Sequence, residues 1–173
     1  IGRNWLDIDR SLHDRFPEIG ESSPMEDAVE LRGFYETYAN NPSSMRIEGS
    51  IAFFRAVSKI APCAIVSGSP HDDVVAAAKL CGIDDCLSLV LGAGEYEVGK
   101  PSPSGFLKAA ELLKVAPADC VVVEDSTVGV KAGVAAGMKV IALDRAALVP
   151  QTFKGETWRV KDLSEIDVGK EFS

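Results

Sequence analysis

The stretch CVVVEDSTVGVKAGVAAGMKVIAL, residues 120–143, decides the fold. Its first part, CVVVED, is a continuous apolar run that ends in two carboxylates, a pattern typical of a strand covered on both faces. Glycines then recur at four-residue intervals and leave one face of a predicted helix bare for close approach to a sheet. The final KVIAL predicts a second strand. Strand, helix and strand in this order predict a right-handed unit with parallel strands.

The same alternation continues on both sides of this stretch. Short apolar runs predict further strands at 63–67, 88–92 and 157–163, the last at a sheet edge. Amphipathic or alanine-rich segments predict helices at 50–60, 71–82 and 104–114, with Ser104 placed to cap the third. The chain from residue 45 to residue 173 is therefore predicted to be an α/β domain with a Rossmann-like parallel sheet and helices on both faces.

The first 44 residues have a different character. Charged and apolar positions alternate there at helical spacing, and Trp5, Ile8 and Leu12 share one predicted face. The sequence NNPSS at 40–44 ends this region. We expect a separate helical segment over residues 1–44.

Composition and charge exclude several classes of function. The chain has 173 residues and a net charge of -8, and no basic cluster suggests a nucleic-acid partner. No apolar run reaches the length that spans a membrane. The four cysteines form no CxxC pair and have mostly apolar neighbours, which favours reduced thiols in a cytoplasmic protein over a disulfide or zinc framework.

Polar residues follow three of the predicted strands. They are Ser67-Gly68-Ser69, then Lys100, and then the pair Glu124 and Asp125. Ligands bind beyond the carboxyl ends of parallel strands, so these groups are expected to converge there. A glycine-exposed turn before a helix can hold phosphate, and adjacent carboxylates suit a divalent cation. Simpler interpretations remain open, since such turns and carboxylates often only cap helices and a lone lysine is usually a surface residue.

Ser67, Lys100 and the Glu124–Asp125 pair, in this order and spacing, resemble the second, third and fourth motifs of the haloacid dehalogenase (HAD) superfamily. The stretch from GKPSPSGF through CVVVEDSTVGVKAGVAAGMKVIAL is similar to the subfamily of β-phosphoglucomutase and phosphoglycolate-phosphatase-like enzymes. The resemblance runs from about residue 45 to residue 167. Residues 1–44 resemble part of the helical cap of that subfamily.

The resemblance implies a magnesium-dependent phosphatase or phosphomutase that acts on a small phosphorylated metabolite, such as a sugar phosphate. An aspartate of the first motif would attack the phosphoryl group and form an aspartyl-phosphate. Ser67 and the Gly68 amide would bind phosphate oxygens. Lys100 would neutralise charge as a catalytic and phosphate-binding residue. Asp125, also catalytic, would bind Mg²⁺ with Glu124 beside it.

The first motif, DxDx(T/V), is not found where the resemblance places it, before the cap. Asp7 and Asp9 fit the spacing, but the preceding IGRNWL is a poor buried strand, and we prefer a cap helix at this position. The strand that carries the motif would lie between the strands at 63–67 and 120–125. We therefore expect the chain alone to be inactive.

Two hypotheses remain for this departure. The chain is an enzyme whose central strand comes from a missing N-terminal segment or a second polypeptide, or it is a non-catalytic derivative that serves as a binding protein. The sequence begins at Ile1 rather than Met, which favours the first hypothesis. The sequence names neither the substrate nor the oligomeric state.

Overall fold

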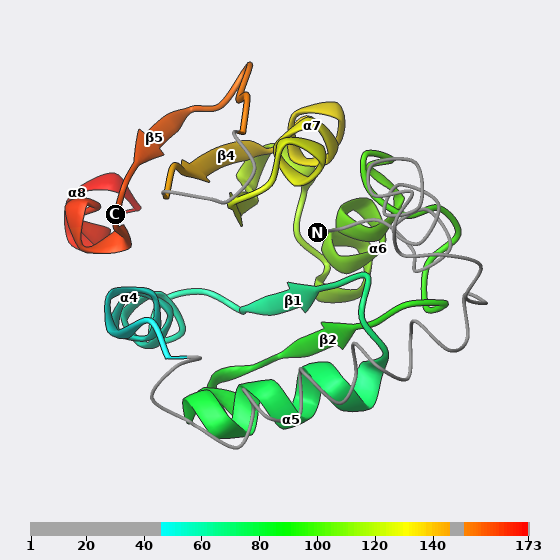
Figure 1. The fold of residues 1–173 in the computed structure, drawn as a ribbon, viewed down its shortest axis with the longest axis horizontal. Coiled ribbons are helices and arrows are strands. Elements are labelled where there is room, and N and C mark those ends of the chain that lie inside the picture. The colour runs from blue at the N-terminus through cyan, green and yellow to red at the C-terminus, as the bar shows by residue number, and fades with distance from the viewer. Residues whose placement is uncertain (1–45, 146–150, 173) are drawn as a thin grey trace, which may run out of the picture. The chain divides into compact units, whose positions relative to one another are not determined.

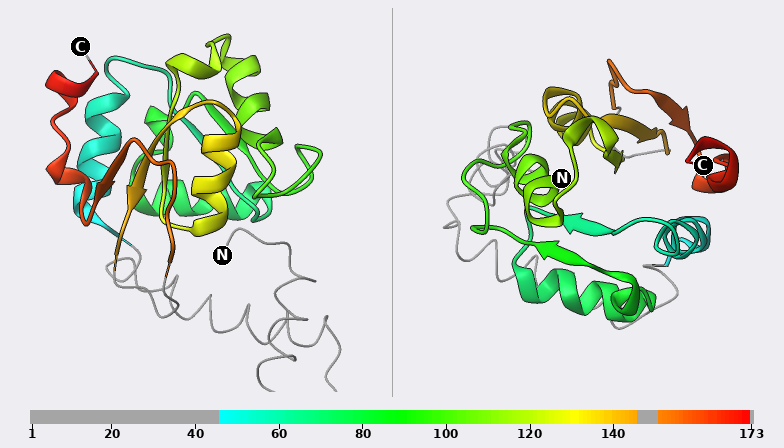
Figure 2. Two further views of the ribbon diagram at one scale, coloured as in Figure 1. Left: turned by 90° about the horizontal axis from the view of Figure 1, so that it is seen from above. Right: turned by 180° about the vertical axis from the view of Figure 1, so that it is seen from behind.

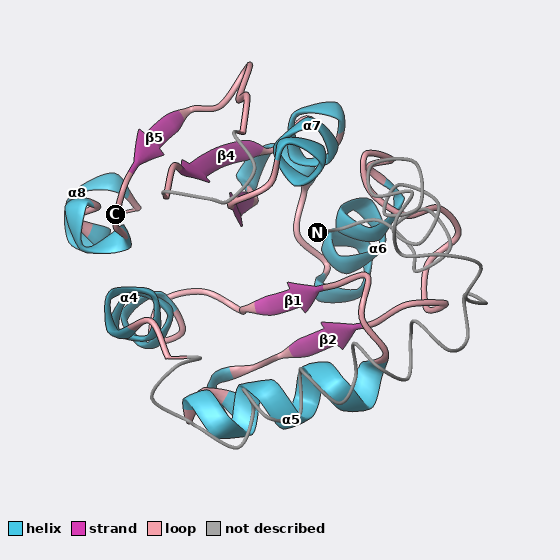
Figure 3. Ribbon diagram, viewed as in Figure 1, coloured by secondary structure: helices cyan, strands magenta, loops and turns pink. Residues whose placement is uncertain are grey.

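The computed structural model describes residues 46–145 and 151–172 (Figure 1). The predicted cap over residues 1–44 and the candidate nucleophiles Asp7 and Asp9 lie outside these ranges, so the division into domains stays a prediction. Within the described ranges, helices and strands alternate as the sequence predicts (Figure 3).

The α-helices of the described chain are α4 (Glu48–Val57), α5 (His71–Cys81), α6 (Ser104–Leu113), α7 (Thr127–Ala135) and α8 (Val168–Glu171). The strands are β1 (Ala64–Val66), β2 (Leu89–Leu91), β3 (Val121–Glu124), β4 (Lys139–Leu143) and β5 (Trp158–Val160). Short 3-10 turns are η2 (Asp84–Cys86), η3 (Pro117–Asp119) and η4 (Leu163–Glu165). Each predicted strand and helix from residue 50 onward is confirmed, with small shifts at the ends.

The strands form two parallel sheets within the described residues, in the orders β1-β2 and β3-β4-β5. Ile65 lies opposite Val90 in the first sheet, and Val123 lies opposite Ile141 in the second. Parallel pairing and the edge position of β5 are confirmed. Among the residues that the structure describes, β1 pairs with β2 and β3 pairs with β4, each on one side.

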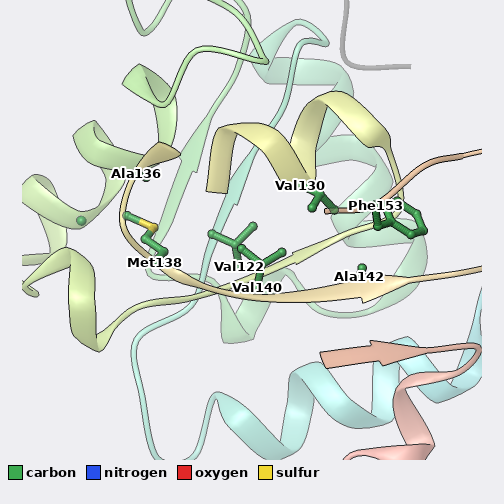
Figure 4. Packing of buried hydrophobic residues seen from close by; sticks show 8 residues of the cluster. Val122, Val130, Ala136, Met138, Val140, Ala142 and Phe153 are labelled. Atoms are coloured by element: carbon green, nitrogen blue, oxygen red, sulfur yellow. The ribbon is translucent and has the colours of Figure 1, made fainter. Parts of the chain in front are cut away.

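The core around α7 is built on β3 and β4. Its buried members are Ala110, Val122, Val130, Ala136, Met138, Val140, Ala142 and Phe153 (Figure 4). Gly133 lets the helix approach, since a Cβ there would lie 2.9 Å from a methyl of Val140 and 3.2 Å from Val122. The bare helix face predicted from the glycine spacing is thus used for close packing against the strands.

A second cluster covers the other face of β3 and β4. Its buried residues are Ile141, Leu143, Val160 and Leu163, and Phe53 of α4 packs against them together with Val121. Helix α4 precedes β1 in the chain but lies beside η4 and α8, which follow β5 (Figures 1 and 2). Helix α4, which precedes β1, therefore packs against the elements that follow β5.

Local signals mark some of the helix ends. Gly82 ends α5 with φ of 66°, and the Ser126 hydroxyl accepts a hydrogen bond from the Gly129 amide to cap α7. The prediction that Ser104 caps α6 is wrong, because Pro103 occupies the cap position. The Ser104 hydroxyl instead bonds the backbone of Val98, donating to its carbonyl at 2.9 Å. It therefore closes the loop that leads to Lys100.

All four cysteines are free thiols; Cys63 is buried, and the other three are partly buried. No helix among the described residues is long and apolar enough to cross a membrane.

Candidate active site

Lys100 lies at the point where the carboxyl ends of β1 and β3 come together. Its ammonium group donates a hydrogen bond to the Val66 carbonyl at 3.0 Å and forms an ion pair with Glu124. Val66 is the last residue of β1, and Glu124 is the last residue of β3. The Lys100 and Glu124 side chains are only 10% and 9% exposed, so the ion pair is largely desolvated. The Phe106 ring lies 4.9 Å below the ammonium and adds a cation–π contact.

Glu124 is held from a second direction by the start of α7. The Ser126 hydroxyl donates to its carboxylate at 3.0 Å while accepting from the Gly129 amide. A Cβ on Gly129 would lie 2.0 Å from the carboxylate, so another residue at this position would displace the Glu124 side chain. The sequence of this turn therefore fixes the direction in which Glu124 meets Lys100.

The loop after β1 carries the predicted phosphate-binding group. The Ser67 hydroxyl accepts a hydrogen bond from the Ser69 amide at 3.1 Å, and the Ser67 amide donates to Leu91 at 2.9 Å. The Tyr96 hydroxyl donates to the Ser67 carbonyl at 2.8 Å. Gly68 is exposed beside these contacts. The loop is thus braced at Ser67, while the Gly68 amide is left accessible.

A carboxylate next to Tyr96 braces the far end of the same loop. One Glu95 oxygen accepts from the Gly92 amide at 2.5 Å and lies 2.9 Å from His71 Nδ1. The Gly92 hydrogen bond, and then the one with His71, lower the pKa of Glu95. A Cβ on Gly92 would lie 2.5 Å from the His71 amide nitrogen, so the two loops meet backbone to backbone.

The Tyr96 phenol also responds to the charge at this edge. Burial raises its pKa, and the negative charge of Glu124 raises it further. Tyr96 therefore stays protonated at neutral pH and remains a hydrogen-bond donor to Ser67.

The predicted metal ligands differ in what they contact. The Glu124 carboxylate is engaged by Lys100 and Ser126. The Asp125 side chain makes no hydrogen bond or ion pair within the described residues, and its residue is exposed. No group of three histidine, cysteine or acidic residues forms a metal site in the described part of the chain. Asp125 thus fits as one hard oxygen ligand, and Mg²⁺ commonly takes one or two carboxylates with water and phosphate oxygens.

Of the predicted site residues, the structure brings Lys100 and Glu124 into direct contact. Ser67 and Asp125 each follow a residue that Lys100 contacts. Lys100 meets Glu124 directly, and through Val66 it touches the residue before Ser67. The roles assigned to Ser67, Gly68, Lys100, Glu124 and Asp125 stay predictions. Sequence reasoning missed Glu95 and Tyr96, since an acidic and an aromatic residue in a loop carry no spacing signal that marks them as braces.

Most of the chain matches a known protein family. The family model for haloacid dehalogenase-like hydrolases matches residues 3–137, which is well over half of the chain. The chain belongs to this family. The haloacid dehalogenase-like assignment agrees with the motif order read from the sequence, with Ser67 directly after β1, Lys100 before α6, and Glu124 and Asp125 at the end of β3.

Curated relatives of this haloacid dehalogenase-like chain include phosphatases. It is 47% identical over 83 residues to a bifunctional riboflavin kinase/FMN phosphatase of Arabidopsis thaliana, covering 47% of this chain and 22% of that protein. It is 37% identical over 106 residues to hexitol phosphatase A of Escherichia coli, covering 61% of this chain and 49% of that protein. The chain thus spans about half or less of the length of these two relatives.

Solved structures agree on the fold. A β-phosphoglucomutase from Clostridium difficile matches with a TM-score of 0.75 and 21% identity, covering 97% of this chain and 75% of that one. A putative β-phosphoglucomutase from Thermotoga maritima matches with a TM-score of 0.71 and 20% identity, covering 94% and 83%. At this identity the likeness establishes the haloacid dehalogenase-like α/β fold.

Proposed function

We propose that this chain carries the phosphate-binding side of a magnesium-dependent phosphatase or phosphomutase site for a small phosphorylated metabolite. The observation that carries the proposal is the position of the Lys100 ammonium, which lies at the joined carboxyl ends of β1 and β3. A desolvated cation at this edge of parallel strands is suited to an anionic ligand.

Ser67 and Gly68 would bind the phosphate oxygens. The Ser67 hydroxyl is already oriented by the Ser69 amide, and the Gly68 amide lies beside it just before α5. Backbone amides ahead of a helix N-terminus attract anions, because they carry the positive end of the helix dipole. Lys100 would neutralise the charge that develops on the transferred phosphoryl group.

The names of some relatives support a substrate class for this proposal. A hexitol phosphatase and β-phosphoglucomutases stand among them, and both names refer to phosphorylated sugars or sugar alcohols. We therefore favour a phosphorylated sugar or sugar alcohol over a phosphoprotein or nucleic acid. The net charge of -8 is compatible with this choice, since the anion would be bound by local groups rather than by the overall field.

The reaction would proceed by in-line displacement. An aspartate oxygen outside the described residues would form a bond to phosphorus as the ester P–O bond breaks, and the leaving alcohol would take a proton from a neighbouring acid. In a phosphatase, water would then attack phosphorus and release inorganic phosphate and the free aspartate. In a mutase, a sugar hydroxyl would attack instead and accept the phosphoryl group, which also frees the aspartate. Asp125 would hold Mg²⁺, which when bound offsets negative charge on the phosphoryl oxygens.

Binding of inorganic phosphate to the full chain in the presence of Mg²⁺ tests the proposal. We expect the amide resonances of Ser67 and Gly68 to shift on titration, and we expect Lys100→Met to weaken binding by about tenfold. The matched control is Lys131→Met, which removes an exposed lysine of α7 and should bind as the unaltered chain does. Equal binding by the chain and the Lys100 variant would overturn the proposal.

Turnover gives a separate test. With Mg²⁺ and sugar phosphates, we expect the chain on its own to release no phosphate above background. The reaction needs a covalent nucleophile, and without one the aspartyl-phosphate cannot form. Phosphate release that Asp7→Asn abolishes would show that Asp7 is the nucleophile.

A further inference from the structure

The start of α7 is held by a residue from the loop that follows β4. The Gln151 side-chain oxygen (Oε1) accepts hydrogen bonds from the Thr127 amide and from the Thr127 hydroxyl, each at 2.8 Å. The Thr127 hydroxyl in turn accepts from the Thr152 amide at 3.0 Å. Thr127 is the first residue of α7, so its amide has no partner within the helix. Three hydrogen bonds therefore join this loop to the turn that carries Glu124 and Asp125.

The contact between Gln151 and Thr127 has a buried anchor close by. Phe153 is buried in the core cluster that includes Val130 of α7. Arg159 of β5 donates to the Phe153 carbonyl at 3.1 Å, and its guanidinium lies 5.4 Å from the centre of the Phe153 ring. Gln151 therefore lies only two residues from a fixed point of the core, which limits how far it moves from Thr127.

Asp125 differs from two other aspartates that precede helical turns in this chain. An aspartate at such a place commonly accepts a hydrogen bond from the amide two residues later. Asp162 and Asp167, which stand directly before η4 and α8, do so at 2.9 Å and 3.0 Å. The amide two residues after Asp125 is that of Thr127, and Gln151 already accepts from it. Within the described residues, the exposed Asp125 carboxylate has neither a hydrogen bond nor an ion pair.

The chemistry of the Gln151 side chain suits a place beside a metal ligand. A carboxylate that accepts from no protein donor keeps its oxygens for a hard cation such as Mg²⁺. The Gln151 amide is uncharged, so it satisfies the Thr127 amide without adding a second anion that would compete for the cation. Contacts of this kind around a ligand set its direction and tune the affinity for the metal.

We propose that Gln151 is a positioning residue for Asp125: by accepting from the Thr127 amide, it keeps the Asp125 carboxylate unpaired and available to a divalent cation. This inference rests on the proposed function, in which Asp125 holds Mg²⁺. It adds a role for the loop after β4, which no motif in the sequence marks.

NMR spectroscopy of the full chain tests the proposal through the hydrogen bond itself. In the unaltered chain we expect a scalar coupling across the hydrogen bond, from the Thr127 amide nitrogen to the Gln151 side-chain carbonyl carbon. Gln151→Met removes the acceptor at similar length, and the Thr127 amide should then couple to the Asp125 carboxyl carbon. Gln151→Glu keeps an acceptor and should keep the coupling to residue 151. Thr152→Ala is the control, because residue 152 contributes its backbone amide to this contact.

Metal affinity provides a second readout. The probe is Mn²⁺, which accepts the same oxygen ligands as Mg²⁺ and broadens nearby resonances. We expect Gln151→Met to bind Mn²⁺ about tenfold more weakly, and we expect no weakening in Gln151→Glu or Thr152→Ala.

The proposal is overturned if the Thr127 amide does not couple to Asp125 in Gln151→Met, or if this variant binds Mn²⁺ as tightly as the unaltered chain. Absence of Mn²⁺ binding by the unaltered chain would contradict the metal-binding role of Asp125 in the proposed function. The coupling would still decide whether Gln151 keeps the Asp125 carboxylate unpaired.

Discussion

The Lys100 ammonium donates to the Val66 carbonyl at 3.0 Å while it forms its ion pair with Glu124. Val66 ends one parallel sheet and Glu124 ends a strand of the other. A single side chain from the loop between β2 and α6 therefore links two sheets that share no strand pairing in the described residues. We therefore expect both the proposed binding of phosphate and the stability of the domain to depend on this contact.

Lys100→Met should destabilise the domain as well as weaken phosphate binding. It would leave the Glu124 carboxylate largely buried without its cation, which costs about 3 kcal/mol for pairs of this kind. Urea unfolding monitored by circular dichroism measures the change. The double variant with Glu124→Gln should recover part of the loss, because no unpaired buried charge remains. A double variant less stable than Lys100→Met alone would contradict this account of the ion pair.

Gly129→Ala should destabilise the start of α7. The new Cβ would lie 2.0 Å from the Glu124 carboxylate, which must move and give up its contacts with Ser126 or Lys100. We expect a loss of about 1–3 kcal/mol in the free energy of unfolding. The control is Gly169→Ala in α8, where a Cβ would lie 3.5 Å from an Asp167 carboxylate oxygen, and it should be neutral or slightly stabilising.

Tyr96→Phe should loosen the loop at Ser67 without removing any group that would bind phosphate. Loss of the hydroxyl removes one hydrogen bond to the Ser67 carbonyl, worth about 1 kcal/mol. We expect weaker binding of inorganic phosphate, measured by titration calorimetry with Mg²⁺. Ser67→Ala serves for comparison, because it removes the hydroxyl but keeps the carbonyl that Tyr96 contacts. Phosphate binding unchanged by Tyr96→Phe would show that this brace has no influence on the site.

The stability of the chain should depend on pH through Glu95. Hydrogen bonds from Gly92 and His71 lower its pKa in the folded state below the usual value of 4.5. The folded state therefore favours the ionised form. This contribution to stability is present above the unfolded pKa and is lost as pH falls through the lowered folded value.

Glu95→Gln should flatten the acid side of the stability profile, measured as the free energy of unfolding between about pH 3 and pH 6. Glu97→Gln, two residues along the same loop and exposed, should preserve the profile of the unaltered chain. If both variants reduced the pH dependence of the free energy of unfolding equally, the prediction of a specific role for Glu95 would be wrong.

The sequence by itself determined the secondary structure from residue 46 onward and the order of the site residues. Buried apolar runs such as CVVVED specify strands because both faces must be covered, and the spacing of Gly129 and Gly133 specifies a helix that approaches a sheet closely. These signals are local, because each depends on a residue and its near neighbours in the chain.

Only the tertiary structure decided which groups meet. It brought the Lys100 ammonium into contact with the Val66 carbonyl and with Glu124, which are 34 and 24 residues away in the sequence. It also brought the Tyr96 hydroxyl within hydrogen-bonding distance of the Ser67 carbonyl. It also arranged the described strands in two parallel sheets, in the orders β1-β2 and β3-β4-β5. Such contacts depend on the paths of the loops and on which strands are present to pair, because hydrogen bonds between distant backbone segments form only after packing has set their distance and direction.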